Sequence, residues 1–433
     1  MEKFCLGVAR EIITPEIGGQ LYGYRPDVFS ESVEDDLTAT AYYFRQGDRK
    51  ALMLSLTVCL IRTQLAAEIL GLIEERFSIP RGNCMLNATH THSGPNTAGE
   101  TGWGDIDRAY CDKIFIPKIL SAVQKAVDST KPVKMGVASG TSLVGISRRE
   151  LNLRNEVILG QNPWACFNSE MTVISFVGED GEAVANLIHY GAHGTAAGLN
   201  HEITRDWSGL MVDAVEEKSG VITAYFNGPE GDVGPRLSNG CTTGDITYVR
   251  ELSAVAARDA VAIYSNISEY SDVDLAVSEK ALVVPLKKRM DYDKAKAMLE
   301  KYKHETVNAN ALIRRHLGDV IRAYDECKPD EECVHEQQTV IGLGDVVFAA
   351  FRYELFSEIG MRIDRAFDTK KVLSLSNTNG SESYMVTQDA ICRGGYEVDM
   401  FLYSHVQPFA DDADFHLVTG TVDHINSLYE SEG

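Results

Sequence analysis

The sequence lacks long hydrophobic runs and has few basic residues for its size. No stretch of about 18 apolar residues occurs, and the run LMLSLTVCLI ends at Arg62, so no transmembrane helix is predicted. The N-terminus, MEKFCLGVAREIITPEIGG, has no apolar segment of signal-peptide length, and we expect no export signal. Lysine and arginine number 41 against 63 aspartates and glutamates, and the resulting net charge of −22 repels phosphate backbones and anionic lipid surfaces. We therefore expect neither nucleic acid nor a membrane as a partner.

The cysteines argue against a disulfide framework. They are nine in number and scattered along the chain, several of them in apolar runs. This pattern favours reduced thiols in a cytoplasmic protein. Cys327 and Cys333 lie near His335, but five residues separate them, whereas zinc-binding cysteine pairs are usually separated by about two to four residues. The intervening KPDEE is typical of a polar turn, and we predict no metal site there.

The organisation of the chain favours the α/β class. Hydrophobic residues make up 44% of the 433 residues, which is enough for a large core, and no repeat or flexible linker divides the chain. Apolar, β-branched runs alternate with stretches of helical periodicity, so we predict a single domain, 1–433, with a central mixed β-sheet flanked by helices. The predicted strands are 38–44, 51–57, 84–89, 172–177, 183–189, 221–226, 282–286, 345–351 and 371–376. The predicted helices are 62–77, 109–129, 208–218, 248–267, 291–325 and 354–368.

The segment 291–325 carries the densest charge and is rich in Lys, Ala, Leu and Arg. This composition predicts a helical insertion, either continuous or broken, that covers one edge of the sheet as a lid or is a solvated helical face.

Alternating histidines follow one predicted strand in NATHTHSGP. In an extended chain, residues two apart project on the same face, so His90 and His92 can point into one site. Taken alone, the pair could bind a metal, form a hydrogen-bonded core pair or contact a substrate.

Two further segments follow predicted strands. In HYGAHGT, His189 lies within an apolar strand and is expected to be a packed core residue, whereas His193 lies where the strand opens into a loop and is the better ligand candidate. The third segment, YFNGPEGDVGPR, is a Gly- and Pro-rich turn that either presents backbone amides to a substrate or is simply a tight connection.

Together these segments resemble the neutral ceramidase family of zinc amidases. GVAREIITP and the following LYGY are similar to the family's opening segment, and NATHTHSGP is similar to its first histidine motif. HGTAAGLNHEITRDWSG resembles the second histidine segment, and GDVGPR resembles the Gly-Asp-Val-Ser-Pro loop. The similarity extends in order from Gly7 to about Tyr396.

The resemblance implies a ligand set. His90 and His193 correspond to two zinc ligands, and Glu354, which follows the predicted strand DVVFAAF and opens a predicted helix, corresponds to a third. Tyr384, in SYMVT, would contact the metal, and Tyr396, twelve residues later, would contact the substrate carbonyl. We expect one zinc ion and no organic cofactor.

This set is chemically consistent with hydrolysis. Two imidazoles and a carboxylate leave one zinc position open, where bound water becomes acidic enough, with a pKa of about 7, to attack a carbonyl. His92 is expected to move protons between the water and the leaving group. Arg148, next to Arg149 in GISRRE, either binds the developing oxyanion or an anionic substrate group, or belongs to a surface arginine pair.

The sequence departs from the family in ways that bear on the substrate. Gly234 stands where the family has the serine of Gly-Asp-Val-Ser-Pro, so Asp232 and Gly234 are expected in a substrate-facing loop with open space beside the metal. We also expect neither the family's C-terminal β-sandwich nor a signal peptide. These differences favour a small, soluble acylated substrate, an amide or an ester, over long-chain ceramide.

Three classes of function remain open. A zinc-dependent hydrolase acting on a C–N bond, with ester hydrolysis as a variant, is favoured. A phosphoesterase-type or other two-metal hydrolase would need a second metal at His92 and Asp206 or Asp232, with the two metals about 3.5–4 Å apart. The third class is a non-catalytic relative that binds metal or ligand. The sequence makes no prediction of the oligomeric state.

Overall fold

The most apolar strands form one large sheet. In the computed structural model, which describes residues 2–430, eight strands lie in the order β14-β12-β11-β8-β1-β4-β5-β6. The runs AYYF in β4 and ALMLSL in β5 are buried on both faces, which explains why they do not alternate with polar residues. In chain order these strands are β1 (Cys5–Ile12), β4 (Thr38–Gln46), β5 (Arg49–Leu56), β6 (Cys84–Ala88), β8 (Lys131–Thr141), β11 (Glu170–Gly178), β12 (Ala183–Tyr190) and β14 (Thr223–Asn227).

The large sheet is mixed. Its two edges are parallel pairs, β5 with β6 and β12 with β14, and the strands between them pair antiparallel. The predicted class, α/β with a mixed sheet, is therefore confirmed. Strands β1 and β8 were not predicted from the sequence.

A second sheet packs against the inner face of the first. It has four strands in the order β16-β17-β18-β20, and Phe348 and Leu373 share one core with Phe44, Phe176 and Phe226 of the large sheet. The sequence predicted only one central sheet, because the first half of β17, CVHEQQ, is polar and gave no strand signal. The strands are β16 (Leu275–Pro285), β17 (Cys333–Leu343), β18 (Val346–Ala350) and β20 (Lys371–Leu375).

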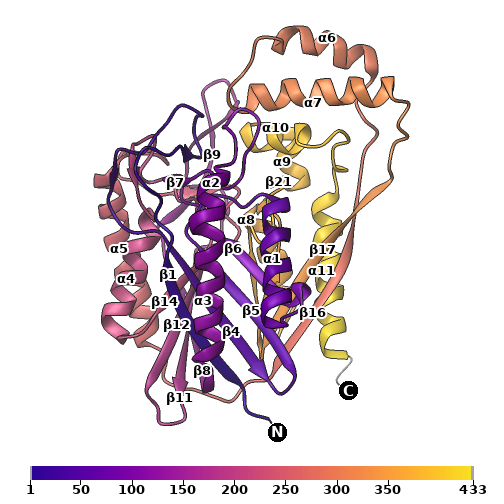
Figure 1. The fold of residues 1–433 in the computed structure, drawn as a ribbon. Coiled ribbons are helices and arrows are strands. Elements are labelled where there is room, and N and C mark those ends of the chain that lie inside the picture. The colour runs from indigo at the N-terminus through magenta and orange to yellow at the C-terminus, as the bar shows by residue number, and fades with distance from the viewer. Residues whose placement is uncertain (1, 431–433) are drawn as a thin grey trace.

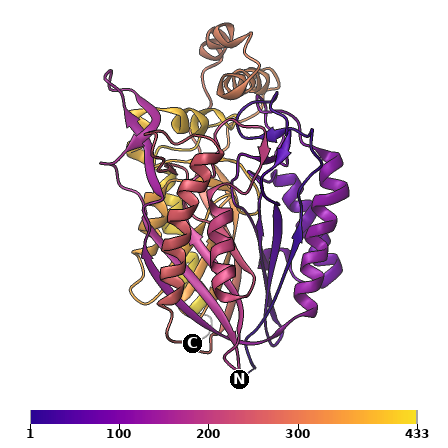
Figure 2. The same cartoon turned by 90° about the vertical axis from the view of Figure 1, so that its left-hand side faces the viewer.

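Helices cover the outer faces of both sheets, so the molecule has four layers (Figures 1 and 2). α1 and α3 cover one part of the large sheet, α4 and α5 cover another, and α8 and α11 cover the small sheet. Each long helix turns an apolar stripe toward its sheet, which is where most of its stability originates. These helices are α1 (Thr63–Phe77), α3 (Ile116–Asp128), α4 (Trp207–Ser219), α5 (Ile246–Ser265), α8 (Ser357–Asp364) and α11 (Ala413–Glu430).

Short elements gather mostly at one end of the sheets, at the top in Figure 1. Glu354 lies in the short strand β19. The sequence had predicted Glu354 at the start of a helix, and this is wrong because α8 begins only at Ser357. The short strands are β2 (Leu21–Tyr22), β3 (Ser32–Val33), β7 (Gly94–Pro95), β9 (Gly145–Leu151), β10 (Val157–Asn162), β13 (Glu202–Ile203), β15 (Val233–Pro235), β19 (Tyr353–Leu355) and β21 (Ser383–Met385). The short helices are α2 (Arg108–Tyr110), a π-helix (Cys111–Phe115), a 3₁₀ turn (Arg81–Asn83), α9 (Gln388–Arg393) and α10 (Tyr396–Tyr403).

The segment 291–325 forms two helices, α6 (Tyr292–Tyr302) and α7 (Asn308–Asp325), at the top of the molecule (Figure 1). Ile313, Leu317 and Val320 of α7 form a small core with Tyr403 of α10. The helical prediction is thus correct, but the hairpin covers α10 and its surroundings and not a sheet edge. Among residues 2–430, no helix is long and apolar enough to cross a bilayer.

Candidate metal centre

The two histidines of NATHTHSGP lie just beyond the end of β6. His90 adopts a left-handed backbone conformation, φ 67°, and its amide donates to the carbonyl of Val58. Thr91 forms an isolated parallel bridge with Gly194, and the amide of His92 donates to the carbonyl of Gly194 at 3.0 Å. The two histidine segments are therefore held side by side by the backbone.

His193 lies just beyond the end of β12. Its amide donates to the carbonyl of Val233, and its own carbonyl accepts from the indole of Trp207 at 2.9 Å. Its side chain is 1% exposed. His189, by contrast, packs inside β12 with Nε2 2.9 Å from the carbonyl oxygen of Ser374, which confirms the predicted core role.

The acidic candidate ligand comes from the other half of the chain. Glu354 and Tyr384 are directly paired in the parallel two-stranded sheet of β19 and β21. The Oε2 atom of Glu354 lies 3.1 Å from Nε2 of His193 and 3.4 Å from Nε2 of His90. The structure thus brings together the three side chains that the resemblance had indicated as ligands.

The hydrogen bonds of the two imidazoles fit metal binding. Nδ1 of His90 lies 3.0 Å from the carbonyl oxygen of Cys59, and Nδ1 of His193 lies 2.9 Å from that of Glu230. An imidazole that donates from Nδ1 keeps its lone pair on Nε2, and in both histidines Nε2 faces the carboxylate of Glu354. The lone pair and the carboxylate repel each other unless a proton or a cation lies between the two groups. Tetrahedral zinc, with bonds of about 2.0–2.1 Å, spaces its nitrogen and oxygen ligands about 3.3–3.4 Å apart. The donor distances observed here therefore fit a zinc-sized ion.

The electrostatics of the cluster agree with this geometry. Burial lowers the pKa of His193 to about 3, and Arg148 and His90 disfavour a further charge there. Burial opposes ionisation of Glu354, but His90 and His193 lower the pKa of its carboxyl well below the usual range. Burial also opposes a charge on His90, but Cys59 and Glu354 raise the pKa of its imidazole. The carboxylate of Glu354 thus favours a positive charge beside the two imidazoles, and a cation can supply it.

Arg148 reaches the centre from β9. Its Nη2 donates to the hydroxyl of Tyr384 at 3.0 Å, and its Nε donates to Glu397 at 2.9 Å. Glu397 also accepts from Arg149 at 2.6 Å. The alternative that Arg148 belongs to a surface arginine pair is wrong, because its side chain is only 7% exposed.

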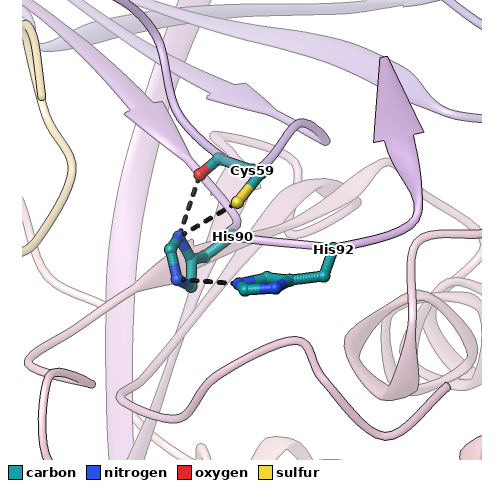
Figure 3. Close-up of side chains that lie close together, drawn as sticks. All are labelled: Cys59, His90 and His92. Atoms are coloured by element: carbon teal, nitrogen blue, oxygen red, sulfur yellow. Dashed lines mark hydrogen bonds between the residues drawn. The ribbon is translucent and has the colours of Figure 1, made fainter. Parts of the chain in front are cut away.

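His92 and Tyr396 lie beside the three ligands. Nε2 of His92 is 3.3 Å from Nε2 of His90 (Figure 3), and burial together with His90 and His193 holds the pKa of His92 well below its usual value. The rings of Tyr384 and Tyr396 meet edge to face with centroids 5.9 Å apart. His90, His92, Glu354, Tyr384 and Tyr396 all line one pocket.

The structure corrects the expectation for Asp232 and Gly234. Asp232 accepts a hydrogen bond from the amide of Ser357 at 2.7 Å, at the start of α8, and does not line the pocket. A Cβ at Gly234 would lie 2.6 Å from Cγ2 of Thr242, so no open space exists there. The loop supports the centre through the carbonyls of Glu230 and Val233, which contact Nδ1 of His193.

The two-metal arrangement finds no support in the structure. Asp206 uses its carboxylate to accept backbone hydrogen bonds from Ala196, Ala197 and Trp207, and Asp232 is engaged at α8. Within residues 2–430, neither aspartate belongs to a group of side chains close enough to share an ion.

Sequence reasoning missed a buried carboxyl behind the ligands. Glu230 is fully buried, and one of its side-chain oxygens accepts from the amide of Asn377, whose nitrogen is 3.3 Å from Nδ1 of His90. Burial raises the pKa of Glu230 to about 8. In the sequence, Glu230 was marked only by being an acidic residue in a turn rich in glycine and proline.

Sequence reasoning also missed a junction beneath the centre. The side chain of Asn87, at the end of β6, accepts from the amide of Asn227 at the end of β14. It also donates to the carbonyl of Ser376, just beyond β20, at 2.7 Å. One amide side chain therefore joins both edges of the large sheet to the small sheet.

Comparisons with known proteins agree with this fold. Residues 4–265 match the model of the neutral/alkaline non-lysosomal ceramidase N-terminal domain. The neutral ceramidase of Pseudomonas aeruginosa is 26% identical over 189 residues, which make up 41% of this chain and 27% of that protein, about a quarter of its length. Among solved structures, the neutral ceramidase from Pseudomonas aeruginosa superposes with a TM-score of 0.76 at 16% identity, covering 99% of this chain and 75% of that chain. A ceramidase complexed with C2 gives a TM-score of 0.74 at 15% identity, covering 99% and 76%.

Proposed function

This chain belongs to the neutral/alkaline non-lysosomal ceramidase family, and on that premise we propose that it is a zinc-dependent hydrolase that cleaves the amide bond of a small, soluble acylated compound. The observation that carries this proposal is the convergence of His90, His193 and Glu354, whose ligand atoms all lie within 4.8 Å of one another. These three residues would hold one zinc ion. Ester hydrolysis at the same site is a variant of the proposal.

The chain's own residues would assist the reaction as follows. When bound, zinc supplies Lewis-acid activation for the hydrolysis of a carbonyl compound by water at neutral pH. Arg148 and the hydroxyl of Tyr384 lie beside the ligands and can stabilise negative charge that develops on the carbonyl oxygen. His92, whose Nε2 lies 3.3 Å from Nε2 of His90, is placed to accept a proton and pass it to the leaving nitrogen. Tyr396, on the pocket wall, would contact the substrate.

The pocket lining supports a polar substrate. Arg62, Glu100 and Glu382 line the same pocket as the histidines, together with Trp103. Arg62 and Glu100 already pair with each other at 2.8 Å, but a long hydrocarbon chain would still take these charged groups out of water, which is unfavourable. We therefore propose that ceramide is a poor substrate and that N-acyl compounds with polar groups are better ones.

Elemental analysis combined with a substrate panel tests the proposal. The panel contains N-acyl amino acids, N-acetyl sugars, simple esters, and short- and long-chain ceramides. We expect about one zinc per chain, turnover of polar N-acyl compounds, loss of turnover on chelation and recovery when zinc is restored.

Three outcomes would contradict separate parts of the proposal. Efficient cleavage of long-chain ceramide would refute the small-substrate part, and turnover that resists chelation would refute the zinc part. Stoichiometric zinc with no turnover of any member of the panel would favour a non-catalytic, metal-binding relative.

We also propose a cytoplasmic location. All nine cysteines are free, and several of them, including Cys166 and Cys241, are exposed. Exposed thiols without partners are typical of a reducing compartment. Cell fractionation with cytoplasmic and exported marker proteins checks this, and recovery in the exported fraction would refute it.

A further inference from the structure

The pocket beside the candidate metal centre has an apolar wall that is backed by α7. Several residues that line the pocket belong to, or pack against, one small core that also contains Leu312 of α7. Leu312 is 2% exposed and is not itself a lining residue, so it packs behind the wall. The lining residues that form this apolar wall are Tyr22, Cys59, Leu60, Ala98, Trp103 and Met400.

A charged wall lies in the same pocket. Nη1 of Arg62 donates to Glu100 at 2.8 Å, and the hydroxyl of the adjacent Thr63 donates to Glu382 at 2.8 Å. Arg62, Glu100 and Glu382 all line the pocket. One side of the pocket therefore offers apolar contact and another offers charged groups and hydrogen bonds.

An N-acyl derivative of a polar amine has the same two-sided chemistry. Resting on the proposed function, we propose that the apolar wall holds the acyl chain of the substrate and that Leu312 limits the length of this chain. The substrates are then short, straight-chain N-acyl derivatives of polar amines. Each methylene buried against the wall strengthens binding about fourfold, whereas the polar amine keeps hydrogen bonds at the charged wall.

Contacts between α7 and segment 98–103 make the wall a fixed boundary. The amide of Asn308 donates to the carbonyl of Gly102 at 2.8 Å, and Nη1 of Arg315 donates to Glu100 at 2.7 Å. The two backbones approach so closely that a Cβ at Gly102 would lie 2.5 Å from the carbonyl oxygen of Asn308. The wall cannot move outward without breaking these contacts, so a chain longer than the wall meets α7.

Binding of straight-chain primary amides, from acetamide to octanamide, tests the wall directly. Calorimetry on chelator-treated protein measures their affinities without hydrolysis and without a metal. In the wild type, we expect the affinity to rise about fourfold per methylene up to a limiting length and then to level off or fall. Leu312→Ala should extend the rise by about two methylenes, so that octanamide binds at least about tenfold more tightly than to the wild type. Acetamide should bind equally well to both proteins.

Two further variants keep this test decisive. Leu317→Ala is a matched control, because Leu317 is a buried leucine of the same helix in a separate core, and it should leave the length profile unchanged. Ala98→Leu fills space at the wall and should shorten the limiting length, and it replaces Leu312→Ala if circular dichroism shows that this variant does not fold. No binding of any amide, the wild-type profile in the wall variant, or an equal shift in Leu317→Ala would overturn the proposal.

Turnover separates this proposal from the proposed function. If the zinc-loaded protein hydrolyses no N-acyl compound while the amides keep the profile that depends on Leu312, the proposed function fails and the acyl site stands. Hydrolysis of N-acylglycines from acetyl to octanoyl with the same chain-length preference in the wild type and Leu312→Ala would refute the acyl site alone.

Discussion

The two halves of the chain contribute different chemistry to the same centre. The half up to residue 265, which matches the family model, supplies His90 and His193 from loops that follow strands of the large sheet. The rest supplies Glu354 and Tyr384 from a small parallel pair beside the second sheet. The candidate nitrogen ligands thus come from one half and the candidate oxygen ligands from the other. Neither half alone therefore holds the complete candidate set.

Removing one ligand from each half should have the largest effect. His193→Ala and Glu354→Gln should each weaken zinc binding more than about 100-fold, because the loss of a direct ligand exceeds the 10–100-fold effect of residues that only orient ligands. Hydrolysis should fall with the zinc content. Elemental analysis after dialysis and zinc competition against a chelator measure the effect.

His201→Ala is a matched control, since this histidine is half-exposed and contacts the carbonyl of Phe29 away from the centre. It should retain full zinc. If Glu354→Gln also kept full zinc while His193→Ala lost it, the centre would belong to the first half alone.

Replacing groups that would assist the reaction without holding the metal should have the next largest effect. His92→Ala, from the first half, and Tyr396→Phe, from the second, should lower turnover about 10²–10³-fold while zinc stays bound, because proton transfer and substrate contact are lost. Single-turnover rates with zinc content measured on the same sample check this. Depleted zinc in His92→Ala would instead make His92 a ligand.

A smaller effect is expected at the contact between the halves. Glu230 orients His193 through its carbonyl and Asn377 through its carboxyl. Glu230→Leu should weaken zinc binding about 10–100-fold, whereas Glu230→Gln keeps an oxygen for Asn377 and should bind zinc nearly as well as the wild type. Equal zinc affinities for the two variants, both of them folded, would show that the hydrogen bond to Asn377 does not position the ligands.

The smallest effect should arise far from the centre, within the first half. Glu11 of β1 accepts hydrogen bonds from Lys118 and Ser121 of α3, both at 2.9 Å, and Lys125 and Lys118 lower the pKa of its carboxyl to about 2. A depressed carboxyl pKa stabilises the folded state above the unfolded pKa of about 4.5, and this contribution is lost as the pH falls toward 2.

Because both lysines are about half exposed, we expect Glu11→Gln to lower the free energy of unfolding by only about 1 kcal/mol at pH 7. Chemical denaturation of the wild type and of Glu11→Gln at pH 7 and near pH 2 measures the difference between their free energies of unfolding. This difference should be smaller at the lower pH. The zinc content of the variant at pH 7 should equal that of the wild type. A difference that is equal at both pH values would exclude the ion pairs as its cause.

The sequence predicted the first half of the centre better than the second. His90 and His193 were recognisable because a histidine directly after an apolar strand is a local pattern. Glu354 and Tyr384 were indicated only by resemblance, and the predicted helix at Glu354 was wrong because its three-residue strand exists only through pairing with β21. Long-range pairing of this kind leaves no periodic signal in the sequence.

The same reasoning explains the other differences. β17 begins with a polar stretch and becomes a strand through its long pairing with β16. Glu230 and Asn377 appear ordinary in the sequence, and only their burial beside His90 shows that they matter. The space expected at Gly234 depended on a neighbour, Thr242, whose position no local pattern specifies.

The junction at Asn87 has a consequence for how the protein matures. It joins β6 and β14 to the segment just beyond β20, and the candidate ligands are spread from residue 90 to residue 354. During synthesis, the two histidines leave the ribosome long before Glu354 is made, and domains generally fold as units. Under the proposed function, zinc acquisition should therefore be a late event that follows release of most of the chain. A nascent protein stalled before residue 354 would present histidines without their carboxylate and should compete poorly for the metal available in the cell.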